Sequence, residues 1–276
     1  MEHNQNAVVI TFPNQKGGEG KTTNIVELAA ALGELGRVCL IIDLTVGTSA
    51  LLGPLMNSWI GSFELVTGAH RVEDCIITNE NGGVTLPHNV HLIPSSQRLA
   101  NLDQWQSQNV SIDARTNLVH SISRLRTRYD YIFVDNSAPQ TLLSILALKV
   151  ADFALLTAMP GNVPSLAVEE ALRVISDAQE YANHKLTLLG IIACRSPSST
   201  NSLKRDWVEH IAKTCVDSSG RSLKFDSEIS YSVVIQKAQM ARKSIFQHQP
   251  NHPIADEYRK LACELEARLK ARNNPS

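Results

Sequence analysis

A glycine-rich stretch between an apolar run and a helical pattern constrains this chain more than any other feature. Residues 7–12 are apolar apart from Thr11, and residues 14–23 read Asn-Gln-Lys-Gly-Gly-Glu-Gly-Lys-Thr-Thr. Gly17, Gly18 and Gly20 allow positive φ and close approach, so successive backbone N–H groups can converge on an anion at a helix N-terminus. The stretch predicts a strand, a phosphate-binding loop and a helix.

Two side chains at the start of this helix suit a nucleotide and its metal. Lys21 is placed to reach the terminal phosphates, and the Thr22 hydroxyl is placed to bind Mg²⁺ beside them. The general P-loop pattern has another glycine at position 15, where this chain has Gln15. A glycine turn that only joins a strand to a helix would not require two lysines and Thr-Thr at this spacing.

A second lysine, Lys16, stands directly before two glycines, and the stretch resembles the deviant Walker A box, Lys-Gly-Gly-x-Gly-Lys-Thr, of the ParA/MinD family. The resemblance implies ATP and Mg²⁺ as cofactors and an ATP-sandwiched homodimer in which Lys16 touches the partner's nucleotide. The residues that it implies for nucleotide binding are Lys16, Gly17, Gly18, Glu19, Gly20, Lys21, Thr22 and Thr23.

The rest of the chain alternates strand and helix patterns. With 276 residues, 43% hydrophobic and 19% charged, it suits one large α/β domain over residues 1–276. We expect a single P-loop domain with a mostly parallel, twisted sheet and helices on both faces, because apolar runs near 37–43, 90–94, 129–135, 152–158 and 186–193 are separated by helical patterns such as 22–35 and 165–181. A docked helix is expected at about 253–272.

Two of these strands end in carboxylates, Asp43 and Asp135, at the edge where α/β proteins bind ligands. Asp135 ends a strand like Walker B, so it is expected to hold Mg²⁺ with Thr22. Asp43 matches the first aspartate of the family's Asp-x-Asp-Pro-Gln segment. By resemblance the predicted metal site is Thr22, Asp43 and Asp135, and the predicted catalytic residues are Lys16, Lys21, Asp43 and Asp135.

The chain departs from the family at two loops. Thr45 stands where relatives have the second aspartate, which helps to position or polarise the attacking water, so slow or partner-stimulated ATP hydrolysis is expected. Asn136 and Ser137 replace the Thr-Pro that follows Asp135 in relatives. Cys194 and Arg195, after the strand near 186–193, are candidates for contact with the base, because relatives line the adenine pocket there.

Positive charge is concentrated in one part of the chain. The net charge is −1, whereas residues 195–243 carry nine basic and five acidic side chains. Relatives bind DNA nonspecifically through their C-terminal third, and an ordinary solvated surface is the alternative. The residues predicted for DNA binding are Lys204, Arg205, Arg221, Lys224, Arg242 and Lys243.

Competing functions leave other signatures. The stripe Tyr258, Leu261, Leu265 and Leu269 could be taken for a MinD-like membrane anchor, but its polar face also carries acids, which favours a docked core helix. Five scattered cysteines without ligand spacing indicate reduced thiols and no metal cluster, and residues 136–193 lack the cysteine that redox relatives require. A metabolic ligase on the same fold is disfavoured by Lys16, by resemblance.

The resemblance therefore implies a cytoplasmic, ATP-dependent dimer that associates with the nucleoid by binding DNA. Such a protein partitions or positions a plasmid, a chromosome region or a protein assembly, with hydrolysis stimulated by a small ParB-like or other partner. The first strand begins near Ala7, so we expect no N-terminal helix-turn-helix extension. The alternative is a MinD-like regulator recruited to membranes.

Overall fold

The computed structural model describes residues 6–13, 18, 20–53, 60–81, 83–95, 97–108, 114–136, 141–159, 164–194, 201–217 and 219–273. Their strands form one seven-stranded sheet in the order β3-β2-β4-β1-β5-β6-β7, and every paired neighbour is parallel. The strands are β1 (Val8–Thr11), β2 (Cys39–Asp43), β3 (Val90–Ile93), β4 (Tyr131–Asp135), β5 (Phe153–Ala158), β6 (Thr187–Cys194) and β7 (Lys224–Ile229).

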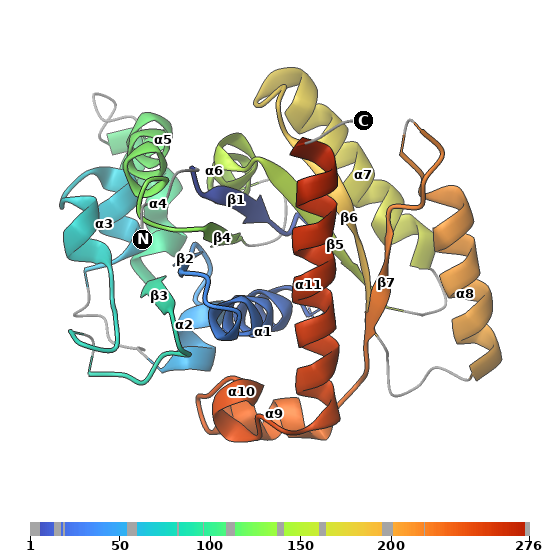
Figure 1. Ribbon diagram of the computed structural model, residues 1–276. Coiled ribbons are helices and arrows are strands. Elements are labelled where there is room, and N and C mark those ends of the chain that lie inside the picture. The colour runs from blue at the N-terminus through green and yellow to red at the C-terminus, as the bar shows by residue number, and fades with distance from the viewer. Residues whose placement is uncertain are drawn as a thin grey trace.

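Helices cover both faces of this sheet (Figure 1). One face packs against α1, α10 and α11, and the other against α3, α5, α6, α7 and α8. The α-helices are α1 (Lys21–Glu34), α2 (Gly47–Leu52), α3 (Ser62–Thr67), α4 (Leu102–Gln108), α5 (Ala114–Leu125), α6 (Leu142–Val150), α7 (Pro164–Tyr181), α8 (Asn201–Thr214), α9 (Val233–Met240), α10 (Ile245–His248) and α11 (Pro253–Asn273), with 3₁₀ turns η1 (Val72–Cys75) and η2 (Gln97–Asn101).

The apolar strands explain the layered arrangement. Every residue of β2 and β4 is buried, and their side chains alternate between the two cores, as Ile41 and Ile42 do. A strand that is apolar on both faces needs helices on both faces. The predicted single P-loop domain with a parallel sheet is therefore confirmed.

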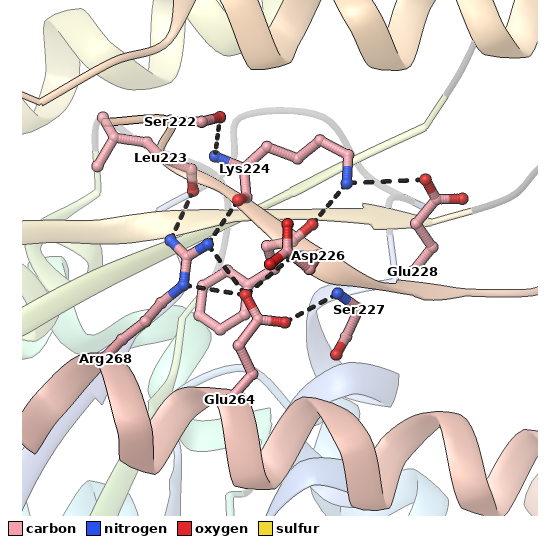
Figure 2. Close-up of polar contacts among 9 residues, drawn as sticks. Ser222, Leu223, Lys224, Asp226, Ser227, Glu228, Glu264 and Arg268 are labelled. Carbon is pink, nitrogen blue, oxygen red and sulfur yellow. Dashed lines mark hydrogen bonds and ion pairs between the residues drawn. The ribbon is translucent and has the colours of Figure 1, made fainter. Parts of the chain in front are cut away.

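The long helix α11 closes the free edge of β7. The pairing of β7 with β6 shifts register between Ile191 and Ala193, and the Glu264 carboxylate accepts hydrogen bonds from Asp226 N and Ser227 N at 2.9 and 2.8 Å. Figure 2 shows Glu264 and Arg268 reaching from α11 to this backbone. A bulged edge strand leaves N–H groups without a sheet partner, and here a helix supplies one.

Helix α11 was predicted from its apolar stripe, and its acidic residues make contacts that were not predicted. The docked C-terminal helix is confirmed, because Tyr258, Leu261, Leu265 and Leu269 are buried. Its acids, however, do not all form a solvated face: besides Glu264, Glu257 accepts hydrogen bonds from Ser230 N and Oγ, and Glu266 pairs with Arg37.

The strand β7 itself was not predicted. Its sequence, Lys-Phe-Asp-Ser-Glu-Ile, carries only two apolar residues, because an edge strand has little surface to bury. Among the described helices, none has the length and apolar composition needed to cross a bilayer.

A buried carboxylate fixes the helix that follows the glycine loop. Glu27 of α1 is 1% exposed and accepts hydrogen bonds from Ile245 N at 2.9 and 3.1 Å, at the start of α10. Burial raises its pKa from the ordinary 4.5 to about 8, although the bond from Ile245 lowers it. The folded protein therefore holds a proton that the unfolded chain releases above pH 4.5.

The Glu27 carboxyl predicts a pH dependence of stability. Between about pH 5 and pH 8 the folded state binds one proton more than the unfolded state, so the free energy of unfolding should fall with rising pH by about 1.4 kcal/mol per unit. Glu27→Gln should remove this dependence of the free energy of unfolding on pH. The contributions of the other titratable groups are the same in both proteins and cancel in the comparison. Urea unfolding of both proteins at several pH values measures it. Parallel curves would mean that Glu27 is ionised in the folded protein.

Candidate functional site at the carboxyl edge of the sheet

Two buried carboxylates lie side by side where β2 and β4 end. Asp43 and Asp135 are partners in the strand register, and both are 0% exposed. The helix α1 begins beside them, because β1 neighbours β4 and its chain returns through the glycine loop. The fold thus brings together Asp43, Asp135 and Thr22, as predicted from the sequence.

Among the described residues, only one of the two carboxylate oxygens of Asp135 accepts hydrogen bonds. Its Oδ2 accepts hydrogen bonds from Thr22 Oγ1 at 2.9 Å and Thr48 Oγ1 at 2.8 Å. Its Oδ1 is buried and accepts none within the part of the chain that the structure describes. Burial, and then the Asp43 charge, raise the pKa of Asp135 to about 7, while both hydroxyls and Lys21 oppose this shift.

This donor set fits a divalent cation. A buried carboxylate oxygen that accepts no hydrogen bond from the described residues, beside a threonine hydroxyl, supplies the hard oxygen ligands that Mg²⁺ prefers. A cation would also offset the repulsion between Asp43 and Asp135, which burial intensifies. Asp135 and Thr22 are therefore the residues that would hold Mg²⁺.

Asp43 is used differently. Its Oδ1 accepts hydrogen bonds from Thr45 N, Thr45 Oγ1 and Val46 N at 2.8, 2.9 and 3.0 Å, and its Oδ2 accepts two from Ser49 N and Oγ, both 2.7 Å. Burial raises the pKa of Asp43, and the bonds from Ser49 and Thr45 lower it. Asp43 therefore organises the loop that follows β2. Its predicted roles in metal binding and catalysis stay predictions.

The loop that follows Asp43 packs tightly against Thr22 and Asp135. The Thr45 hydroxyl accepts from Gly47 N at 2.7 Å, and Val46 has φ 132°, a conformation that costs a β-branched residue free energy. A Cβ at Gly47 would lie 2.8 Å from Thr22 Oγ1, so only glycine fits there. The position that replaces the family's second aspartate thus shapes the loop.

Sequence reasoning missed Thr48 and Ser49. These two hydroxyls, in the first turn of α2, hold Asp135 and Asp43 respectively, and Ser49 Oγ also accepts from Ser95 N at 2.9 Å. The available signal was a Thr-Ser pair shortly after a strand-end carboxylate, where N-terminal hydroxyls of a helix commonly make such bonds.

The glycine loop is described in part. Gly18 and Gly20 have φ 84° and 80°, the positive values that the sequence predicted, and Lys21 is the first residue of α1. Residues 14–17 and Glu19 lie outside the described residues. The predictions for Lys16, Gly17 and Glu19 therefore remain as they stand.

A cleft of ≈ 230 Å³ opens beside the described glycines. It is bounded by Gly18, Gly20, Thr23 and Cys194, and by residues that were not predicted: Asn24, Met159, Ile229, Ser230, Tyr231, Ser232, Ile235, Gln236, Gln239 and Tyr258. Arg195 lies outside the described residues.

Asn24 connects this cleft with the loop. Its amide donates to Gly20 O at 2.9 Å and to Cys194 Sγ at 3.4 Å, and its Oδ1 accepts from the Tyr258 hydroxyl at 3.2 Å. Hydrogen bonds of Asn24 thus connect the wall of the cleft in α1 with β6 and α11. Thr23 faces α9, where its hydroxyl accepts from Gln239 Nε2 at 2.8 Å.

Of the residues predicted for DNA binding, the four whose side chains the structure describes do not form one patch. Lys224 is 9% exposed and bonds Phe225 O and Glu228, so its prediction as a surface cation is wrong. Arg221 precedes β7 at the amino edge, whereas Arg242, beside Lys243, donates to Gly53 O at the carboxyl-edge side. Both Arg242 and Lys243 are exposed. The side chains of Lys204 and Arg205, on α8, lie outside the description.

Most of the chain is similar to known proteins. A family model described as "AAA domain" matches residues 7–188. The chromosome-partitioning ATPase Soj of Thermus thermophilus is 26% identical over 271 residues, covering 95% of this chain and 96% of that protein.

Two solved structures share the fold at lower identity. The cell division ATPase MinD of Pyrococcus furiosus has a TM-score of 0.71 and 22% identity, covering 95% of this chain and 99% of that one. Cobyrinic acid a,c-diamide synthase of Mycobacterium smegmatis, solved with ADP and magnesium, has a TM-score of 0.74 and 21% identity, covering 98% and 97%. The chain therefore belongs to the AAA-domain family, with the fold of the ParA/MinD-type P-loop ATPases.

Proposed function

We propose that this protein is a ParA-type ATPase that binds ATP and Mg²⁺, dimerises on ATP, and partitions or positions a cargo on DNA. The observation that carries the proposal is the Thr22–Asp135 pair at the carboxyl edge, next to positive-φ glycines at the start of α1. This arrangement suits a metal-bound triphosphate. The relative Soj is a chromosome-partitioning ATPase, which supports the same reading.

Different residues of this chain would bind the phosphates, the Mg²⁺ and the base of ATP. Loop N–H groups and Lys21 face the phosphates, Thr22 and Asp135 hold Mg²⁺, and the cleft with Cys194 takes the base. Bound ATP·Mg²⁺ supplies the γ-phosphoryl group whose transfer to water is the reaction. Asp43 keeps the loop 45–49 in place, and this loop excludes solvent from Asp135.

The dimer, the DNA and the partner are inferred by resemblance. Lys16 is expected to neutralise γ-phosphate charge across the interface, and a small ParB-like or other partner is expected to stimulate hydrolysis. DNA binding is favoured over MinD-like membrane recruitment because the apolar stripe of α11 is buried in the core and offers no face to a bilayer. The cargo is a plasmid, a chromosome region or a protein assembly, and the protein acts in the cytoplasm on the nucleoid.

Lys16→Ala tests the proposal against Lys21→Ala as its matched control. Removal of the Lys16 charge should leave ATP binding intact but keep the protein monomeric, whereas Lys21→Ala should weaken ATP binding itself. Light scattering and nucleotide titration separate the two effects. Only the ATP-bound wild type should then bind duplex DNA, with affinity falling steeply as salt rises. A wild type that stays monomeric at saturating ATP would contradict the proposal.

The threonine at position 45 predicts slow hydrolysis. A threonine hydroxyl cannot accept a proton as a carboxylate does, and here it is engaged by Asp43 and Gly47. Thr45→Asp should raise steady-state ATP turnover, by up to about 100-fold, without tightening ATP binding. Thr45→Ser, which keeps the hydroxyl, is the control. Equal turnover of all three proteins would show that catalysis does not depend on this position.

A further inference from the structure

A cluster of three arginines lies at the amino edge of the sheet, opposite the edge where Gly18 and Gly20 lie. A pocket of ≈ 200 Å³ opens there between the start of β7 and the end of α11. One water occupies about 30 Å³ in the liquid, so the pocket is large enough for a small polyatomic ion. It is lined by Leu189, Asp217, Arg221, Ser222, Leu223, Arg268, Ala271 and Arg272.

Arg268 forms the fixed side of this pocket. Its guanidinium pairs with Glu264, donates to Leu223 O and Lys224 O, and lies 4.0 Å from the centre of the Phe225 ring (Figure 2). A guanidinium held by that many contacts does not move to meet a ligand. The Glu264 carboxylate is itself engaged by two backbone N–H groups of β7.

Arg221 is presented by a tight turn. Asp217 Oδ1 accepts hydrogen bonds from Ser219 N, Ser219 Oγ and Arg221 N at 2.9, 2.6 and 3.0 Å. These bonds lower the pKa of Asp217 to about 2. The Arg221 side chain, 75% exposed, lies 3.4 Å from the other Asp217 oxygen. Asp217, the one carboxylate among the described residues that line the pocket, is therefore already bonded to the turn and to Arg221.

Arg272 completes the cluster. It donates to Leu188 O at 2.9 Å, and it forms no ion pair with any residue of the described ranges. Burial lowers the pKa of Arg272, and the charges of Arg268 and Arg221 lower it further, against the opposing effect of Asp217. Three guanidinium groups thus lie at one pocket, and the two carboxylates that pair with them, Glu264 and Asp217, leave one positive charge unbalanced among the described residues.

We propose that Arg221, Arg268 and Arg272 form a binding site for a phosphate group at the amino edge of the sheet. The planar fork of a guanidinium matches two phosphate oxygens, and such charge-assisted bonds are strong. Backbone carbonyls hold the Arg268 and Arg272 guanidinium groups in place, which lowers the entropy lost on binding. Because the Nε and both Nη atoms of Arg268 already donate to Glu264 or to carbonyls, Arg268 contributes its charge rather than a fork. The phosphate is either free or part of a DNA backbone.

In the DNA case the site rests on the proposed DNA binding and relocates it. Arg221 was predicted to bind DNA together with Lys224 and Arg242, but Lys224 is buried and Arg242 lies toward the other edge. The helix α11 instead brings Arg268 and Arg272 next to Arg221. In the free-phosphate case the site is independent of the proposed function.

The test compares two double variants that each remove two positive charges. Arg221→Ala with Arg272→Ala should weaken phosphate binding at least ten-fold, whereas Lys237→Ala with Lys260→Ala, which removes two exposed lysines outside the pocket, should leave it unchanged. Binding is measured as the saturable rise in melting temperature with inorganic phosphate, at constant ionic strength set with chloride. Saturating ADP and Mg²⁺ are present throughout, so that the glycine loop is not the site being titrated. Arg221→Ala alone changes an exposed side chain and serves if the double variant folds poorly.

A labelled duplex with ATP present distinguishes the two sources of phosphate. If DNA is the source, the Arg221/Arg272 variant binds it more weakly, and the slope of log affinity against log salt flattens by about 0.9 for each lost contact. If only inorganic phosphate binding is lost, the site takes a small phosphate. ATP-dependent dimerisation in the same samples reports separately on the proposed function. Wild-type binding of both ligands by the Arg221/Arg272 variant, or no effect of phosphate beyond that of chloride on the wild type, overturns the proposal.

Discussion

Two like charges buried side by side, Asp43 and Asp135, are the constraint on which the rest of this site depends. Neither carboxylate is exposed, and repulsion in a dry interior is costly. The Asp43 carboxylate accepts five hydrogen bonds from the loop that follows it. One oxygen of Asp135 accepts hydrogen bonds from two threonine hydroxyls. The Oδ1 of Asp135 accepts no hydrogen bond from the described residues and is the oxygen that would bind a cation. The strained backbone of Val46 is held by the same bonds.

The site is also joined to the far end of the chain. Asn24 links Gly20 to Tyr258 of α11, and Glu27 links α1 to the start of α10. Helix α11 in turn closes the edge strand β7 through Glu264 and Arg268 (Figure 2). Gly20, the cleft beside it and helices α10 and α11 are therefore connected by hydrogen bonds to α1.

The sequence predicted the parts of the molecule that depend on local patterns. Continuous apolar runs gave the buried strands, strand-end position gave Asp43 and Asp135, and glycine spacing gave the positive φ of Gly18 and Gly20. What it could not show depends on partners distant in the chain. The β7 strand has only two apolar residues, so neither its pairing with β6 nor its contact with α11 could be predicted from the sequence. Lys224 was predicted as a surface cation, but the fold buries it. Thr48 donates a hydrogen bond to Asp135, which is 87 positions away in the sequence.

The most direct test of the account is the position of the metal in a crystal grown with an ATP analogue and Mn²⁺ in place of Mg²⁺. Anomalous scattering locates Mn²⁺ without reference to the protein coordinates. The account predicts a single peak between the Thr22 hydroxyl and Asp135, with the phosphates on the glycine loop and the base in the cleft beside Cys194. A peak away from Asp135, or a nucleotide bound elsewhere, would contradict it.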